Sequence, residues 1–272
     1  MVSRYCPTTL AEALAVRNEE KVVPFGGGTD LMISPKEGVT YLFVHRIAEM
    51  KKIYEDDEYI RIGASCTFTE VQFTPLVPKM MRDAISEIAA PAIRNAGTMG
   101  GNIGNGSAKA DSVLVEYTMG AKLRLASVDG ERIIPIEQFY KGRKELDLHD
   151  NELIVEILLP KTGTDNYFYQ KVGARKALAI SRIAFGGIIQ MDGNIIKDIS
   201  VAFGAVANTV LRYREIEKML IGKTLEEAHA LRPTFVKAYD DAMQLTRGRV
   251  SAEYRKTVCM NLLNAFLDDK GI

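Results

Sequence analysis

The sequence of 272 residues predicts an α+β protein with two domains. Short apolar runs of strand length alternate with helical patterns as far as Pro160. Residues 160–164, Pro-Lys-Thr-Gly-Thr, have the composition of a linker. Beyond them, strand-like segments come first and helical segments last, which is the order of a separate α+β unit. We therefore expect domains at 1–162 and 163–272.

The first domain is predicted to begin with a helix and to continue in short strands. Thr8 or Thr9 can cap a helix through Leu14, with Glu12 in its first turn. Apolar residues at helical spacing occupy 79–90, and we expect Pro91 to end that helix. Strand-like runs are found at 22–24, 41–44, 59–64, 121–126, 132–136 and 153–159. The acidic residues 55–58 are predicted to form a solvated turn.

The second domain is predicted to form an antiparallel meander followed by helices. Its strand-like segments are 167–172, 183–191 and 199–206, with a turn at Asp192-Gly193. Thr224 and Glu227 form the pattern of a capping box. Helical periodicity then covers 236–245 and 254–267.

The composition excludes several classes of function. Lys plus Arg and Asp plus Glu each number 35, so the zero formal charge predicts no attraction to nucleic acid or anionic membranes. No run approaches the roughly 18 apolar residues of a membrane span, and the amino terminus has no signal-peptide pattern. Cys6, Cys66 and Cys259 lack metal-type spacing and favour a reduced, cytoplasmic protein.

Two glycine-rich segments carry most of the functional information. Gly26–Asp30 reads Gly-Gly-Gly-Thr-Asp, and 97–106 holds five glycines in ten residues. Because glycine costs about 1 kcal/mol relative to alanine inside a helix, we expect the second segment to be neither helix nor core strand. Successive amides of bare turns bind anions, so two such segments indicate a ligand with an extended phosphate spine. The alternative is that both are merely tight turns.

Polar side chains beside these glycines suit a nucleotide. The hydroxyl of Thr29 or Thr98 can donate to a phosphate oxygen. Asn102 and Asn105 can fix the loop geometry or bind polar groups of the ligand. Asp111 only accepts when ionised, which suits ribose or ribityl hydroxyls.

Two common nucleotide motifs are absent. The chain contains no G-x-G-x-x-G, which argues against a Rossmann site. Gly222-Lys223-Thr224 imitates the end of a Walker motif, but the required upstream glycine is Glu217. We interpret this segment as a helix cap.

Four segments in order give the chain a specific pattern. They are PFGGGTDLMI at 24–33, IRNAGTMGGNIGNGSAKADS at 93–112, NELIVEILLP at 151–160 and YQKVGARKALAISR at 169–182. With them the chain resembles, over nearly its whole length, the FAD-binding subunit of molybdenum hydroxylases. This group includes xanthine dehydrogenase, aerobic CO dehydrogenase and nicotinate dehydrogenase.

The resemblance implies the fold in more detail. An FAD-binding domain of the vanillyl-alcohol-oxidase or PCMH-like type is expected over 1–162, with α/β subdomains at about 1–52 and 53–162. A carboxy-terminal domain with a three-stranded antiparallel sheet and helices is expected over 163–272.

The resemblance also implies the FAD contacts. The pyrophosphate is expected to bind Pro24, Phe25, Gly26, Gly27, Gly28, Thr29, Asp30 and Leu31, together with Thr98, Met99, Gly100, Gly101 and Asn102. Asp111 matches an acidic FAD contact, and Asn105 lies where some relatives have a threonine that touches FAD. Ile154 and Lys171 match positions that approach the ring system, and Tyr169 is expected to stack near the isoalloxazine. For Lys171, a plain surface lysine is the alternative.

Three features depart from the family pattern. Residues 147–152 read Asp-Leu-His-Asp-Asn-Glu where many relatives have Pro-Gly before Glu, so that loop is expected to be reshaped. Arg175-Lys176 fits a basic pair, but Ile183-Ala184-Phe185 is bulkier than usual. No cysteine-rich insertion is present, so the iron–sulfur cluster of one branch is not expected.

The resemblance implies that this chain carries out one step of electron transfer within a larger complex, as follows. Substrate is oxidised at a molybdopterin-containing large subunit, and electrons pass through two [2Fe–2S] clusters on a ferredoxin-like chain to this FAD. NAD⁺ or another acceptor then takes them. No catalytic acid, base or nucleophile and no metal site is expected on this chain, since His45, His149 and His229 show no triad or ligand spacing.

Two other functions stay open at this point. One is a nucleotide-binding regulatory or assembly protein of the same fold that does not turn over. The other is a stand-alone FAD oxidase, which 272 residues disfavour because they leave little room for a substrate-capping domain.

Overall fold

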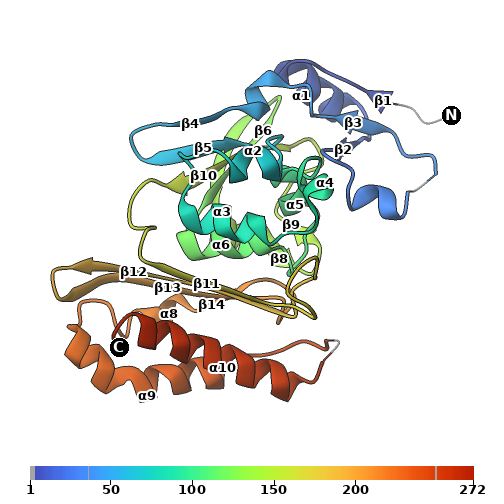
Figure 1. Cartoon of the computed structure of the whole chain (residues 1–272). Helices are drawn as coiled ribbons and strands as arrows, with labels where there is room; N and C mark the ends of the chain where they lie inside the picture. Colours follow the sequence, from blue (N-terminus) through green and yellow to red (C-terminus); the bar gives the residue numbers. More distant parts are fainter. Residues whose placement is uncertain (1–3, 36, 249) are drawn as a thin grey trace. The chain divides into compact units, whose positions relative to one another are not determined.

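The computed structural model describes residues 4–35, 37–248 and 250–272, so the first three residues of the predicted 1–162 domain lie outside the described part (Figure 1). The chain divides into two compact units. The first comprises Met1–Val77, Ala89–Ser107 and Gly120–Lys161, and the second comprises Pro78–Ile88, Ala108–Met119 and Thr162–Ile272. The chain therefore enters the second unit twice before the predicted boundary. Each unit is described by itself below.

The first unit contains a small parallel sheet with strand order β1-β3-β2. Its strands are β1 (Arg4–Tyr5), β2 (Val23–Phe25) and β3 (Tyr41–Phe43). The helix α1 (Leu10–Glu19) separates the first two strands, and Thr9, one of the two predicted cap residues, caps it. The structure adds that Thr9 and Glu12 form a capping box. Two 3₁₀ turns, η1 (Leu31–Ile33) and η2 (Ala48–Lys51), follow β2 and β3.

A five-stranded antiparallel sheet forms the rest of the first unit's framework. Its order is β4-β5-β10-β6-β7, so β10, the last in sequence, is the central strand. The strands are β4 (Ile53–Glu55), β5 (Tyr59–Gly63), β6 (Lys122–Ser127), β7 (Gly130–Pro135) and β10 (Leu153–Pro160). Smaller elements are α2 (Phe68–Gln72), α4 (Pro91–Arg94), α5 (Met99–Gly104), α7 (Ile136–Phe139), β8 (Tyr140–Gly142) and β9 (Glu145–Leu146). The predicted strands and the acidic turn at 55–58 are thus confirmed.

The second unit confirms the predicted antiparallel sheet followed by helices. β11 (Tyr167–Val172), β12 (Ile183–Asp192) and β13 (Ile195–Gly204) form the meander, and the two-residue strand β14 (Leu211–Arg212) extends it at one edge. The helices are α3 (Lys79–Ser86), α6 (Asp111–Met119), α8 (Arg214–Glu217), α9 (Leu225–Ala242) and α10 (Ala252–Asp269).

Helices cover both faces of this four-stranded sheet (Figure 1). A side chain added at Gly186 would meet Thr118 of α6, whereas one added at its neighbour Gly187 would meet Phe266 of α10. Successive residues of a strand point to opposite faces, so α6 and α10 lie on opposite faces of β12. On the α10 side, Phe185 packs edge-on against Phe203 with ring centroids 5.2 Å apart.

Two predicted helix ranges differ from the structure: 236–245 belongs to α9, which spans Leu225–Ala242, and the helix expected over 79–90 is shorter. The helix expected over 79–90 ends at Ser86, because Ala89 has a φ of 46°, in the left-handed region. Pro91 does not end that helix but begins the next one, α4, at its first position. Proline is favoured there because the missing amide would have no helical partner.

The helix α6 carries a buried carboxyl group that has no hydrogen-bond partner among the described residues. Both oxygens of Glu116 are in this state, and the side chain is 0% exposed. Burial raises the pKa of Glu116 well above its ordinary value, which favours the protonated form of the carboxyl group in the folded protein. In the described ranges, no helix combines the length and apolar content that crossing a membrane requires.

We expect Glu116→Leu to stabilise the second unit by about 1–3 kcal/mol, because it removes an unsatisfied buried group. The pKa of Glu116 is higher in the folded than in the unfolded chain, so the cost of the unsatisfied group gains a pH-dependent part, which is absent below pH 4.5 and grows as the pH rises. Urea unfolding at pH 5 and pH 8 should therefore show the larger gain at pH 8.

Glu217→Leu is the matched control for this prediction. Glu217 is equally buried but accepts from the Val201 amide at 2.7 Å and pairs with Arg212 at 2.9 Å, so its loss should destabilise the protein. Destabilisation by Glu116→Leu, or a gain that does not change with pH, would contradict the prediction.

Candidate functional site

The two predicted glycine segments touch each other in the first unit. A methyl group placed on Gly27 would lie 1.7 Å from the carbonyl oxygen of Ala96, and one on Gly26 would lie 2.5 Å from Oγ1 of Thr98. Gly28 has a φ of 69°, a conformation that glycine adopts without strain. The two segments were singled out by composition alone, and the structure brings their backbones into direct contact.

The expectation that 97–106 contains no helix is wrong. Met99–Gly104 form α5, and Oγ1 of its N-cap residue Thr98 accepts from the Gly101 amide at 3.1 Å. The amides of Met99 and Gly100 donate to the carbonyls of Cys66 and Ala64, at 3.0 and 2.8 Å. These tertiary hydrogen bonds offset the low helix propensity of glycine.

Packing explains why glycines occur inside this helix. A methyl group on Gly100 would lie 2.6 Å from the Cβ of Ala64, so only glycine lets α5 approach the 64–66 segment. Gly101 and Gly104 are exposed, which leaves one side of α5 without side chains. A large ligand can therefore approach the backbone of α5 closely.

The free backbone donors lie in the first glycine segment. Within the described residues, the amides of Gly26–Asp30 donate no hydrogen bond, whereas those of Met99, Gly100 and Gly101 all have acceptors. Gly26, Gly27, Gly28 and Thr29 are half-buried. Half-buried amides without acceptors favour an anionic ligand, and a bare loop gives its oxygens access.

The other predicted contacts of the first unit surround α5. Asn105 is the C-cap residue of α5, and its amide donates to the Gly101 carbonyl at 3.0 Å. Ile154, on β10, is 8% exposed and lies near Gly104, where a methyl group would be 3.8 Å from its Cδ1. Both residues therefore lie beside the glycine-rich helix.

The predicted contacts of the second unit form a charged cluster. Lys171, on β11, donates to Oδ2 of Asp111 at 2.8 Å and to the Glu87 carbonyl at 2.8 Å. The side chains of Lys171 and Asp111 are 7% and 6% exposed. The alternative that Lys171 is a plain surface lysine is therefore wrong, because its ammonium is buried against a carboxylate.

Tyr169, on the same strand, has a buried hydroxyl group that lacks a partner among the described residues. Burial raises the pKa of the Tyr169 phenol, and the negative charges of Asp111 and Glu87 raise it further. The phenol is therefore neutral and keeps its proton, which makes it a free hydrogen-bond donor.

Sequence reasoning did not single out Ser181. Its hydroxyl donates to Oδ1 of Asp111 at 2.5 Å, and the residue is 2% exposed. No local signal identifies it, since a serine before a strand is ordinary, and only the pairing of β11 with β12 brings it to the carboxylate.

The loop at 147–152, which departs from the family pattern, is fixed by ion pairs. Arg132 contacts Oε1 of Glu152 at 2.6 Å and Oδ2 of Asp147 at 2.9 Å. Arg132 lies on β7, so the two ion pairs fasten the loop to that strand.

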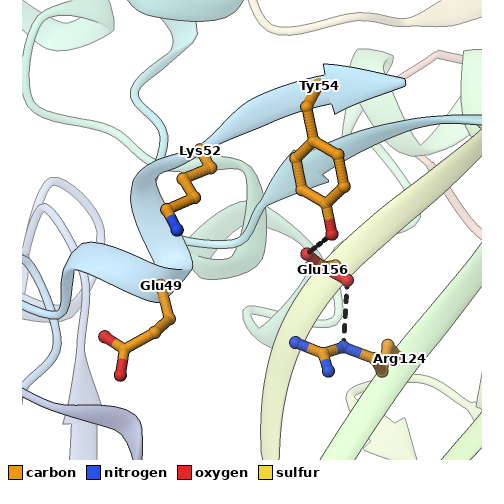
Figure 2. A pocket seen from close by; sticks show the side chains of 5 residues that line it. All are labelled: Glu49, Lys52, Tyr54, Arg124 and Glu156. Carbon is orange, nitrogen blue, oxygen red and sulfur yellow. Dashed lines mark hydrogen bonds and ion pairs between the residues drawn. The ribbon is translucent and has the colours of Figure 1, made fainter. Parts of the chain in front are cut away.

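A separate open cavity of about 400 Å³ lies on the five-stranded sheet of the first unit (Figure 2). It is lined by Glu49, Lys52, Tyr54, Arg124 and Glu156. The buried Glu156 accepts from the Tyr54 hydroxyl at 2.9 Å and forms ion pairs with Arg124 at 2.9 Å and Arg61 at 3.2 Å. These partners lie on other strands of the sheet and satisfy the hydrogen-bonding capacity of the buried carboxylate. We therefore interpret the cluster as a structural one that holds the strands of the sheet together.

None of the residues predicted to bind the cofactor lines that cavity. In the described ranges, no group of three or more His, Cys, Asp or Glu side chains is placed to hold a metal ion. Cys6 is an exposed free thiol, and Cys66 and Cys259 are buried free thiols.

Comparison with known proteins agrees with this geometry. Residues 1–162 match the FAD binding domain in molybdopterin dehydrogenase, and residues 168–269 match the CO dehydrogenase flavoprotein C-terminal domain. The chain belongs to the family of FAD-binding subunits of molybdenum hydroxylases, whose members are parts of oxidoreductases.

Individual relatives cover nearly the whole chain. The nicotinate dehydrogenase FAD-subunit of Eubacterium barkeri is 31% identical over 271 residues, covering 93% of this chain and 90% of its own. The xanthine dehydrogenase FAD-binding subunit of Escherichia coli O157:H7 is 28% identical, with 91% and 88% covered. Reconstituted CO dehydrogenase from Oligotropha carboxidovorans superposes with a TM-score of 0.89 at 26% identity, covering 100% of this chain and 98% of that one.

We expect Gly27→Ala to disrupt the contact between the glycine segments, because its methyl group would overlap the Ala96 carbonyl. Overpacking of this kind costs about 1–3 kcal/mol or more, so the melting temperature should fall by roughly 5 °C and FAD binding should be lost. Differential scanning fluorimetry and flavin fluorescence titration measure the two effects.

Gly104→Ala is the matched control, since its nearest new contact would be at 3.8 Å and alanine is the better helix former. It should keep or raise the melting temperature. Equal melting temperatures of the two variants would show that the close packing at Gly27 does not matter.

Proposed function

We propose that this chain is the FAD-containing electron-transfer subunit of a heteromeric molybdenum hydroxylase. It takes electrons from [2Fe–2S] clusters on a partner chain and passes them to NAD⁺ or another acceptor. The observation that carries the proposal is the bare segment Gly26–Asp30, whose amides have no acceptors among the described residues. The family membership identifies the ligand of such a site as FAD.

The residues of the first unit fit a dinucleotide pyrophosphate. The amides of Gly26–Asp30 would donate to the phosphate oxygens, with Pro24, Phe25 and Leu31 flanking them. The segment Thr98–Asn102 would contribute backbone that its glycines leave free of side chains, together with the amide side chain of Asn102. Asn105 and Ile154 would contact the cofactor from beside α5.

The residues that the resemblance assigns to FAD in the second unit fit, by their chemistry, hydroxyl groups and a ring system. Asp111 would accept from a ribose or ribityl hydroxyl, because Ser181 and Lys171 use only two of its roughly four acceptor sites. Tyr169 would contact the ring system through its partnerless hydroxyl or its ring face. FAD would supply the redox chemistry when bound, and the buried Lys171 ammonium, which pairs with Asp111, would hold a positive charge that favours the reduced flavin.

The cysteine content supports a separate iron–sulfur chain. Two [2Fe–2S] clusters need about eight thiolates, and this sequence has three cysteines. We therefore propose a ferredoxin-like partner and a large molybdopterin-containing partner, assembled in the cytoplasm. The relatives support this arrangement, since several are named as a subunit or medium chain of a larger enzyme.

Purification of the complex from native cells tests this proposal. The expected preparation contains three chains, molybdenum, and about four iron atoms per FAD, which corresponds to two [2Fe–2S] clusters. The visible spectrum should contain flavin and iron–sulfur bands. If NAD⁺ restores the oxidised bands after the complex has been reduced, NAD⁺ is identified as the electron acceptor. An iron-free preparation in which a small substrate reduces the flavin directly would instead indicate a stand-alone oxidase. A colourless protein that FAD cannot reconstitute would leave a regulatory or assembly role.

We expect Lys171→Met to weaken FAD binding and to lower the reduction potential of the bound flavin, because it removes a buried positive charge near the cofactor. A tenfold change in the relative affinity for the oxidised and reduced forms corresponds to about 30 mV. Redox titration of the reconstituted chain with a reference dye measures it. Lys79→Met is the control, since Lys79 is exposed and pairs with Asp83 instead. Unchanged affinity and potential in Lys171→Met would remove this role.

A further inference from the structure

The carboxylate of Asp111 is held by two donors from one β-hairpin. Lys171, near the end of β11, donates to Oδ2 at 2.8 Å, and Ser181, before β12, donates to Oδ1 at 2.5 Å. The carboxylate itself lies on the first residue of helix α6. Three elements of the second unit thus meet at one side chain.

The pairing of β11 with β12 explains why these two donors converge. Val172 pairs with Ile183, and the Arg182 amide donates to the Val172 carbonyl at 2.9 Å. Lys171 immediately precedes Val172, and Ser181 immediately precedes Arg182. The two donors therefore lie at opposite ends of the connection 173–180. The Asp111 carboxylate accepts a hydrogen bond from each of them and so links the two ends.

The burial of the group makes each donor important. Asp111 and Ser181 are 6% and 2% exposed, so water cannot replace a lost hydrogen bond freely. A hydrogen bond from a hydroxyl to a carboxylate is short and about twice as strong as a neutral one. Lys171 holds one oxygen alone, and without Ser181 the carboxylate could rotate about its Cβ–Cγ bond.

The connection 173–180 does not need Ser181 for its own shape. The guanidinium of Arg175 donates to the Ala177 carbonyl at 3.0 Å and to the Leu178 carbonyl at 2.5 Å. This bracing lies within the connection itself. The hydroxyl of Ser181 is therefore directed at the carboxylate and not at the loop.

We propose that Ser181 is a positioning residue for the cofactor. It fixes the plane of the Asp111 carboxylate so that the acceptor sites left free by Ser181 and Lys171 face a hydroxyl of FAD. The inference rests on the proposed function, in which Asp111 binds FAD, and it adds a residue to which the resemblance assigned no FAD contact.

The test is the dissociation constant for FAD of the full chain, measured by quenching of flavin fluorescence. Ser181→Ala should raise it about tenfold to a hundredfold, since a hydrogen bond to a charged group accounts for that range. Ser181→Thr keeps the hydroxyl and should restore the constant to within about threefold. Ser181→Cys keeps the size with a weaker donor and should give an intermediate value, which preserves the test if the alanine variant does not fold.

Ser200→Ala is the matched control. Ser200 is also buried in the second unit, and its hydroxyl contacts the guanidinium of Arg212 rather than Asp111. It should leave the affinity for FAD unchanged. A loss of affinity equal to that of Ser181→Ala would overturn the inference, because it would show a general effect of removing a buried hydroxyl.

A double-mutant cycle separates this inference from the proposed function. In an Asp111→Ala background, Ser181→Ala should have no further effect on FAD binding. If Asp111→Ala weakens binding and Ser181→Ala alone does not, the positioning role is overturned while the proposed function stands. If Asp111→Ala itself leaves binding unchanged, the assignment of Asp111 to FAD fails instead.

Discussion

The close approach of backbone to backbone around α5 is the constraint on which the first unit's site depends. The bulged centre of β10 presents the Val155 carbonyl to the Ala64 amide at 2.8 Å, and the Ala64 carbonyl accepts from Gly100 at 2.8 Å. Gly27 then lies against the Ala96 carbonyl with no room for a side chain. A continuous path of backbone contacts therefore links the central strand of the sheet to the loop that offers free amides.

This arrangement decides which amides remain available for a ligand. The first turn of α5 would ordinarily leave its amides without partners, which is what makes helix amino termini attractive to anions. Here the 64–66 segment and the Thr98 hydroxyl use them. The amides of Gly26–Asp30, by contrast, donate no hydrogen bond within the described residues. The glycines of α5 serve close packing on one side and leave bare backbone on the other.

The buried carboxyl groups of Asp111 and Glu217 in the second unit are matched by hydrogen-bond donors, whereas that of Glu116 is not. Asp111 is matched by Lys171 and Ser181, and Glu217 by Arg212 and the Val201 amide. Each carboxylate thereby regains in the fold the donors that it loses on leaving water. Glu116 has no such partner among the described residues, and burial favours its protonated form, so it marks a position where the packing tolerates a neutral acid without using it.

Local chemistry in the sequence determined much of this protein. The cap at Thr9, the capping box at Thr224 and the alternation over β6 appear as predicted, and the turn predicted at Asp192-Gly193 lies one residue further on, at Gly193-Asn194. Each of these features depends on residues close in the chain. The glycine-rich segments and Asp111 were also recognisable from their residue types and order. Only the tertiary structure decided that 99–104 is helical, that Lys171 is buried and that Ser181 meets Asp111. Those outcomes depend on contacts between segments 30 to 80 residues apart. The energy of such a contact outweighs a local preference of about 1 kcal/mol per residue, and no window of sequence contains both partners.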